Sequence, residues 1–199
     1  MTLFCSFLIV IATFTPIPLK VLSLPPEALI NPGSFFANLN SLENIWNILI
    51  YIPQMPVVIM IACMLGPGLG FLSTLIYISA GLAGLPVFAS GGGIEYFSRL
   101  GFGYILGFFV GVLVTGKMIK NNTSRPNVLK SAIIGIITIH LVGIVYLAGF
   151  LLFTQESLSS LFTWVWQLSG TQILYDMLFG IITAFLGRMI RVGIWIVTD

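Results

Sequence analysis

Charged residues are scarce in this 199-residue sequence: Lys, Arg, Asp and Glu make up 7% of it, against about a quarter of a soluble globular domain. Hydrophobic residues account for 58%, and the mean hydropathy is +1.09. This balance excludes a soluble domain and indicates an integral membrane protein. The net charge of +2 says little about partners, and no nucleic-acid partner is expected.

Metal-binding and nucleophilic residues are also few. Cys5 and Cys63 lie inside apolar runs and are expected to be small buried residues without a disulfide. The single histidine, His140, has no second His, Cys cluster or carboxylate at i+4, so a helix–helix hydrogen bond is expected and a zinc site or proton relay is not. No Gly-rich phosphate loop ending in Lys-Ser or Lys-Thr is present. The sequence therefore predicts no enzyme, no metal and no cofactor.

Six apolar segments indicate membrane spans. They cover about residues 3–22, 46–65, 67–85, 101–118, 131–153 and 171–197. We therefore predict an all-α integral membrane protein with a single membrane domain over residues 1–199. Pro16 and Pro18 are expected to break or kink the first helix, which lacks a basic n-region and a cleavage site and so is interpreted as a span, not a signal peptide. The tripeptide Gly66-Pro67-Gly68 predicts a tight turn between the second and third spans.

Basic residues set the expected orientation. Half of them lie in or around the fourth connection: Lys117, Lys120, Arg125 and Lys130. Arg188 and Arg191 end the last span. Because cytoplasmic loops carry an excess of Lys and Arg, both termini are expected inside a multi-pass cell-membrane protein. The connections 23–45, 86–100 and 154–170 then face outward.

Small residues recur at a helical spacing in the fourth span. Gly103, Gly107 and Gly111 are four residues apart and share one helix face. Such a face lets two helices approach closely in lipid. Packing within the bundle and docking of another subunit are both compatible with this pattern.

A Gly-rich connection is the first candidate for a binding site. It reads Gly84-Leu85-Pro86-Val87-Phe88-Ala89-Ser90-Gly91-Gly92-Gly93 and is followed by Glu95 and Arg99. Irregular backbone carrying an acid and a base is costly at membrane depth and is tolerated mainly where it is buried in protein or lines a cavity. Glycine there also lets the backbone approach a ligand closely.

Several motifs in order resemble the BioY family, the membrane-embedded biotin-binding S components of energy-coupling-factor (ECF) vitamin transporters. They are Gly84-Leu85-Pro86-Val87-Phe88, the run Gly91-Gly92-Gly93, and Phe102-Gly103-Tyr104-Ile105-Leu106-Gly107-Phe108. The resemblance is strong over residues 50–150 and weak over 171–191. It implies a six-helix S component that binds biotin near its outer face. It also implies partners: one transmembrane coupling subunit and two ATPase subunits, which alone use ATP.

The resemblance suggests how the chain would hold biotin, which has a carboxylate at one end and a ureido ring at the other. Arg99 would bind the carboxylate through its planar fork; the alternative is an ion pair with Glu95, four residues earlier. The ureido ring needs donors and acceptors, and an aromatic side chain could cover the apolar ring or belong to an interfacial belt. The expected ligand-binding residues are Phe88, Ser90, Gly91, Gly92, Tyr96, Arg99, Gln172 and Asp176.

The sixth span departs from the family pattern. The family begins this helix with Pro-Gly-Asp-Leu and a basic residue at the next turn, whereas here the segment runs from Ser169 to Asp176 without Lys. Gln172 or Asp176 could stand for the family's Asp, and Asp176 has either a functional role or a partly wet place at the outer helix end. An S component for another vitamin is therefore the alternative transport function. A membrane enzyme is a further alternative, but the sequence contains no Ser/His, Cys/His or metal-binding constellation to support it. A structural assembly factor is a third alternative, but it would not need Arg99.

Overall fold

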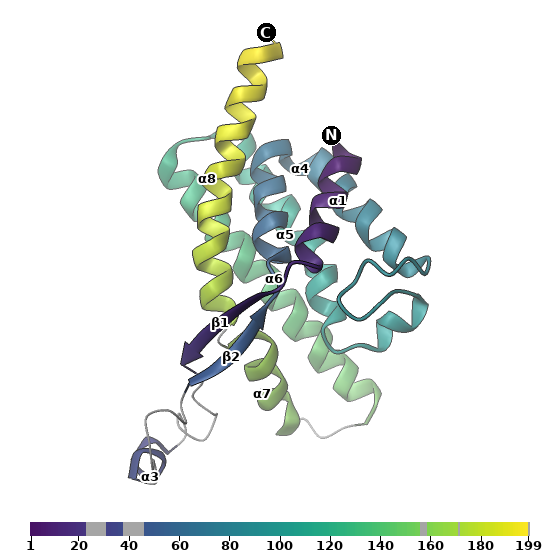
Figure 1. Ribbon diagram of the computed structural model, residues 1–199, viewed down its shortest axis with the longest axis vertical. Coiled ribbons are helices and arrows are strands. Elements are labelled where there is room, and N and C mark those ends of the chain that lie inside the picture. The colour runs from purple at the N-terminus through teal and green to yellow at the C-terminus, as the bar shows by residue number, and fades with distance from the viewer. Residues whose placement is uncertain (23–30, 38–45, 156–158, 171, 199) are drawn as a thin grey trace.

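The computed structural model describes residues 1–22, 31–37, 46–155, 159–170 and 172–198 (Figure 1). Its helices are α1 (Thr2–Thr13), α3 (Pro32–Ala37), α4 (Gln54–Leu82), α5 (Phe102–Asn121), α6 (Arg125–Phe153), α7 (Ser159–Val165) and α8 (Gln172–Thr198). Two single turns, the 3-10 segment η2 (Ile94–Ser98) and the π-helical segment η3 (Trp166–Gly170), precede α5 and α8. Helices α1, α4, α5, α6 and α8 run side by side as a bundle, which confirms a mainly helical membrane protein.

Long apolar helices dominate the bundle. Within the described residues, α5, α6 and the segment that contains α8 are long and apolar enough to cross a membrane, as is α4 when its two halves are counted together; α1 is a shorter apolar helix. The predicted span 101–118 corresponds to α5, 131–153 to α6 and 171–197 to α8. The first predicted connection, 23–45, lies largely outside the described residues.

The predicted tight turn between the second and third spans is present inside α4. Gly66 adopts φ 76° and ψ −171°, a conformation that only glycine takes readily, and Pro67 starts the next helical stretch. A Cβ placed on Gly70 would lie only 3.7 Å from the Cα of Ala62, whereas eight residues of a straight helix span about 12 Å. The chain therefore turns back on itself at Gly66. The first half of α4 is therefore the later part of the second predicted span, 46–65, and the second half corresponds to the third predicted span, 67–85.

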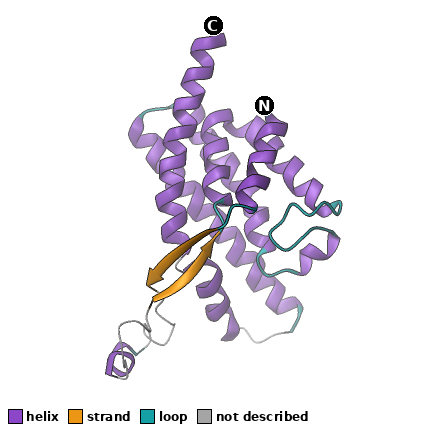
Figure 2. Ribbon diagram, viewed as in Figure 1, coloured by secondary structure: helices purple, strands orange, loops and turns teal. Residues whose placement is uncertain are grey.

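The prediction of an all-α fold is wrong in one region. Strands β1 (Ile17–Leu22) and β2 (Trp46–Tyr51) form an antiparallel pair that runs from Ile17↔Tyr51 to Leu22↔Trp46 (Figure 2). The predicted first span, 3–22, is therefore helical only to Thr13, because Pro16 and Pro18 cannot donate the backbone hydrogen bonds that would extend it. The predicted second span, 46–65, becomes helical only at Gln54, directly after Pro53.

The glycine face of α5 packs inside the bundle. A Cβ on Gly107 would lie 2.8 Å from the backbone oxygen of Ile139 in α6, and a Cβ on Gly103 would meet the Tyr146 side chain at 2.3 Å. Packing within the bundle, and not docking of another subunit, thus accounts for these glycines. Cys5 and Cys63 are fully buried and free, as the sequence predicted.

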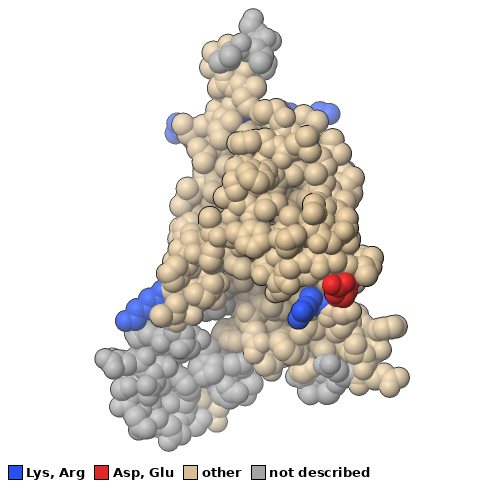
Figure 3. Space-filling model, turned by 45° about the vertical axis from the view of Figure 1, so that its right-hand side comes forward, with Lys and Arg blue, Asp and Glu red and all other residues tan. Residues whose placement is uncertain are grey.

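Exposed charged side chains lie toward the two ends of the molecule on the face shown in Figure 3. On the face shown in Figure 3 the middle is uncharged, and basic side chains appear near the end at which both chain termini lie in Figure 1. At this end Arg188 Nε donates a 2.6 Å hydrogen bond to the Thr123 carbonyl, so the connection between α5 and α6 lies beside α8. The opposite end carries β1, β2 and the Gly-rich connection (Figure 1).

Candidate functional site

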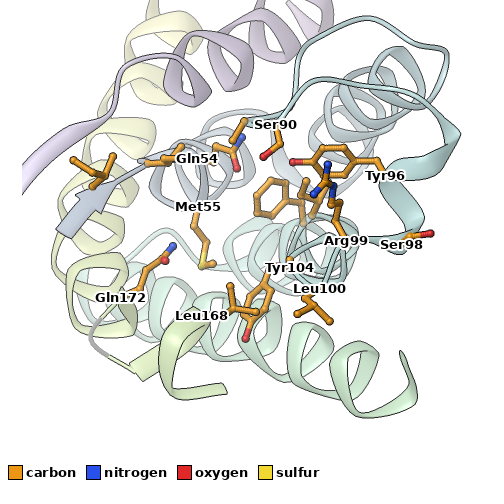
Figure 4. Close-up of a pocket in the computed structure, with 16 residues that line it drawn as sticks. Gln54, Met55, Ser90, Tyr96, Ser98, Arg99, Leu100, Tyr104, Leu168 and Gln172 are labelled. Atoms are coloured by element: carbon orange, nitrogen blue, oxygen red, sulfur yellow. The ribbon is translucent and has the colours of Figure 1, made fainter. Parts of the chain in front are cut away.

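A cavity of about 500 Å³ lies at the end opposite the termini (Figure 4). Strand β2, the start of α4, the connection after α4, α5, η3 and the start of α8 all contribute to its wall. Its apolar lining comprises Ile50, Ile52, Met55, Ala89, Leu100, Ile105, Phe108 and Leu168. Its polar lining comprises Gln54, Ser90, Tyr96, Ser98, Arg99, Tyr104 and Gln172. A mostly apolar hollow with a few polar groups is the usual form of a small-molecule site.

Four of the sequence-predicted residues line this cavity: Ser90, Tyr96, Arg99 and Gln172. They come from segments separated by more than 70 residues, and Figure 4 shows Ser90, Tyr96 and Arg99 on one side and Gln172 on the other. Between the two alternatives in the sixth span, the structure therefore places Gln172, and not Asp176, at the cavity.

The Gly-rich connection forms a compact loop beside the cavity. Phe88 and Gly91 exchange two backbone hydrogen bonds of 3.0 Å, and Gly91 has φ 109°. A Cβ on Gly92 would lie 2.1 Å from the Leu85 carbonyl oxygen, so only glycine fits there. The structure places Phe88, Gly91 and Gly92, which were expected to contact a ligand, in this loop and outside the cavity lining.

Phe88 anchors this loop to the bundle. Its ring is fully buried, and its centroid lies 4.5 Å from that of Tyr96 and 5.4 Å from that of Tyr77. Gly81 makes room for it, since a Cβ there would meet the Phe88 ring at 2.1 Å. An apolar ring on a loop is better stabilised in the core than at a wet cavity, and by fixing Tyr96 it shapes the cavity wall indirectly.

Arg99 brings an exposed positive charge to the cavity. Its guanidinium forms no hydrogen bond or ion pair with any of the described residues, so the alternative of an ion pair with Glu95 is wrong. In Figure 4 the guanidinium lies beside Tyr96, on the same side as Ser90. A planar cation in this position is suited to a carboxylate ligand.

Gln54 is a polar residue that the sequence interpretation missed. Its Nε2 donates to Thr13 Oγ1 (2.5 Å) and to Tyr77 Oη (2.9 Å), while Thr13 donates its own hydrogen to the Ile9 carbonyl. Both amide hydrogens are thus used, and the carboxamide oxygen points toward the cavity (Figure 4). A lone Gln at the start of an apolar span was the signal available in the sequence.

Asp176 lies behind the cavity wall, where it is fully buried and does not line the cavity. Tyr51 Oη donates a 2.8 Å hydrogen bond to Oδ1, and His140 Nε2 lies 3.2 Å from Oδ2. Burial, and then the adjacent carboxylate, raises the pKa of Tyr51, so its hydroxyl stays a donor. Asp176 thus lies outside the lining of this cavity and is not a wet group at the helix end.

His140 makes the helix–helix hydrogen bonds expected of it. Its Nδ1 lies 2.9 Å from Ser169 Oγ, which is in turn 2.7 Å from Tyr104 Oη. The described residues contain no group of three or more metal-binding side chains that could hold an ion.

A family sequence model and individual relatives both match the BioY family. The sequence model of the BioY family matches residues 35–195. A probable biotin transporter BioY from Lysinibacillus sphaericus is 43% identical over 96 residues, which are 47% of this chain and 49% of that protein. A probable biotin transporter BioY from Pyrococcus horikoshii is 37% identical over 99 residues, 49% of this chain and 58% of that one.

The fold resembles one solved structure closely. It is the crystal structure of the S-component for biotin from an ECF-type ABC transporter, with a TM-score of 0.67 and 22% identity. The match covers 96% of this chain and 88% of that one. At this identity the likeness concerns the fold, and the sequence alignments span only about half the length of the curated relatives.

Proposed function

Since the chain belongs to the BioY family, we propose that it is the membrane-embedded substrate-binding subunit of a biotin uptake transporter. It captures biotin in the cavity at the end opposite its termini and passes it inward when an ATP-driven partner changes its orientation or shape. The family consists of transporter components, and this chain performs no chemistry on its ligand. Two relatives named as biotin transporters support the proposal.

One observation carries the choice of ligand: an apolar cavity of about 500 Å³ with an unpaired guanidinium at its wall. Biotin joins an apolar ring and chain to a single carboxylate. The apolar lining would bury the ring and chain, and Arg99 would offset the carboxylate charge through its two-pronged fork. A cation left without an anionic partner in the described part of the chain is what such a ligand requires.

The ureido end of biotin carries two N–H donors and a carbonyl acceptor. The free oxygen of Gln54 is an acceptor for an N–H group, and the Gln172 amide across the cavity offers both a donor and an acceptor. Ser90 and Tyr96 add hydroxyls close to Arg99. The proposed contacts are therefore Gln54, Ser90, Tyr96, Arg99 and Gln172, with Phe88, Gly91 and Gly92 shaping the loop behind them.

The transporter setting follows from the family and its fold. The structurally similar protein is titled as an S-component from an ECF-type ABC transporter. By analogy this chain would dock on one transmembrane coupling subunit and two ATPase subunits. The basic end with both termini would face the cytoplasm, and the cavity would face outward.

Calorimetric titration of the protein in lipid nanodiscs tests the proposal. Biotin is expected to bind with nanomolar affinity, about −12 kcal/mol, and thiamine and riboflavin are expected to give no binding heat. Absence of biotin binding below about 10 μM would refute the assignment. Binding of thiamine or riboflavin in its place would make the chain an S component for that vitamin.

A further inference from the structure

Five buried polar side chains form one connected chain behind the cavity: Tyr51, Asp176, His140, Ser169 and Tyr104. We call these residues the polar chain. Both oxygens of Asp176 are occupied, one by Tyr51 (2.8 Å) and one by His140 (3.2 Å). Ser169 then links His140 (2.9 Å) to Tyr104 (2.7 Å). The polar chain thus connects β2, α8, α6, η3 and α5 around a single buried carboxylate.

Each end of the polar chain reaches the cavity wall. Tyr51 stands between Ile50 and Ile52, which both line the cavity, while Tyr51 itself is 1% exposed on the opposite side of the strand. At the other end Tyr104 lines the cavity, and so does Leu168, the neighbour of Ser169. Asp176 therefore does not line the cavity, but it is hydrogen-bonded to side chains that hold the residues of the cavity wall in position.

The Tyr51 side chain links strand β2 to helix α8. Among the described elements the strand's extensive packing is with β1 alone, which itself leads away from the bundle. What ties it to α8 is the Tyr51 side chain, whose ring stacks on Phe179 (5.3 Å between centroids) and whose hydroxyl bonds Asp176. Helix α8 is fixed in its turn, since a Cβ on Gly187 would meet the Met60 carbonyl at 2.4 Å.

We propose that Asp176 is a positioning residue of the ligand site, which holds the β2 wall of the cavity in place through Tyr51 and the Tyr104 wall through His140 and Ser169. The ligand itself is taken from the proposed function. A buried carboxylate is stable only while its donors stay in place, because losing a donor leaves an unsolvated charge. The anion therefore keeps Tyr51 seated, and with it the isoleucines that cover one side of the cavity.

Tyr51→Phe tests the proposal with the smallest change, since it removes one hydroxyl and keeps the stacked ring. The matched control is Tyr175→Phe, on the neighbouring ring of α8, whose hydroxyl bonds none of the described residues. We expect Tyr51→Phe to raise the biotin dissociation rate about tenfold, with an association rate within about twofold of the parent. Tyr175→Phe should leave both rates unchanged. Equal dissociation rates for the two variants would overturn the proposal.

Asp176→Asn separates positioning from mere folding. The amide keeps the shape but removes the charge that strengthens the bond to Tyr51, so a smaller rise in dissociation rate is expected. Because Tyr51→Phe has already removed one of the two contacts of Asp176, the double variant should dissociate more slowly than the product of the two single effects predicts. Thr183→Val, which removes a different α8 hydrogen bond, to the Pro56 carbonyl, is the control for lost stability and should not alter dissociation. Independent, multiplying effects of the Tyr51 and Asp176 changes would contradict the coupling.

A ligand-free measurement keeps this test distinct from the test of biotin binding. Spin labels at Ile48→Cys on β2 and Leu186→Cys on α8, both exposed, report the position of the strand in a background without Cys5 and Cys63. Tyr51→Phe should broaden the distance distribution, and Tyr175→Phe should leave it narrow. A protein that fails to bind biotin but shows this broadening refutes the proposed ligand and not the anchor. An unchanged distribution in Tyr51→Phe refutes the anchor itself.

Discussion

The carboxylate of Glu95 turns back over Gly93 and does not pair with Arg99. A Cβ placed on Gly93 would lie 2.6 Å from Glu95 Oε1, which shows how closely the carboxylate covers that residue. Residues 94–98 form a 3-10 turn, and Arg99 follows it in an extended conformation (φ −86°, ψ 131°). The i,i+4 geometry of an α-helix therefore does not apply, and the guanidinium stays available to a ligand.

Arg99→Ala is expected to weaken biotin binding by at least about thirtyfold, or about 2 kcal/mol, because the ligand carboxylate loses its charged partner. Arg99→Lys should recover only part of this loss, since an ammonium cannot reproduce the planar fork. Titration calorimetry on the three proteins provides the measurement.

The control for this prediction is biotin methyl ester, which has no carboxylate charge. The ester should bind the parent and Arg99→Ala with similar affinity. Equal losses for acid and ester would show that Arg99 organises the loop and does not bind the carboxylate.

Glu95→Gln is expected to leave biotin affinity unchanged, or to raise it slightly by removing a nearby negative charge. The reason is that Glu95 and Arg99 form no ion pair in the ligand-free protein. The same titration measures the effect. A loss as large as that of Arg99→Ala would mean that the two side chains work as a pair.

Gly107→Ala is expected to lower stability by about 1–3 kcal/mol, because the added methyl group would press on the backbone of Ile139 and force α5 from α6. Gly149→Ala, in α6, is the matched control, since a Cβ there meets nothing within 4 Å. Thermal unfolding in detergent should show a lower midpoint for Gly107→Ala alone. Equal midpoints for both variants would contradict the close packing of the glycine face.

Asn122→Cys, in the exposed connection between α5 and α6, should react with a membrane-impermeant maleimide only after cells are opened. Ile94→Cys, where the native side chain is 70% exposed at the opposite end, should react in intact cells. Both changes are made without Cys5 and Cys63. Strong labelling of Asn122→Cys from outside would reverse the proposed orientation.

Local chemistry predicted much of the helical framework. The turn at Gly66, the close approach at Gly107 and the interhelical hydrogen bonds of His140 each follow from a rule that acts over a few residues or on one helix face. The glycine-rich loop and Arg99 were found for a similar reason, because polar or irregular segments stand out in an apolar chain.

Pairing between distant segments could not be predicted in the same way. Residues 17–22 and 46–51 are apolar enough to belong to spans, and only their pairing with each other makes them strands. Asp176 was expected near a ligand because an intramembrane carboxylate is often functional. Its partners, Tyr51 and His140, lie 125 and 36 residues away in the sequence, so no local pattern predicts these contacts.

Protection of cavity residues by biotin tests the central claim most directly. Ser90→Cys and Gln172→Cys lie on two sides of the cavity (Figure 4), and Ile94→Cys is an exposed control outside its lining. With Cys5 and Cys63 removed, saturating biotin should slow alkylation of both cavity cysteines at the same half-saturating concentration and leave Ile94→Cys unaffected. Unchanged alkylation of both cavity cysteines at saturating biotin would show that this cavity is not where biotin binds.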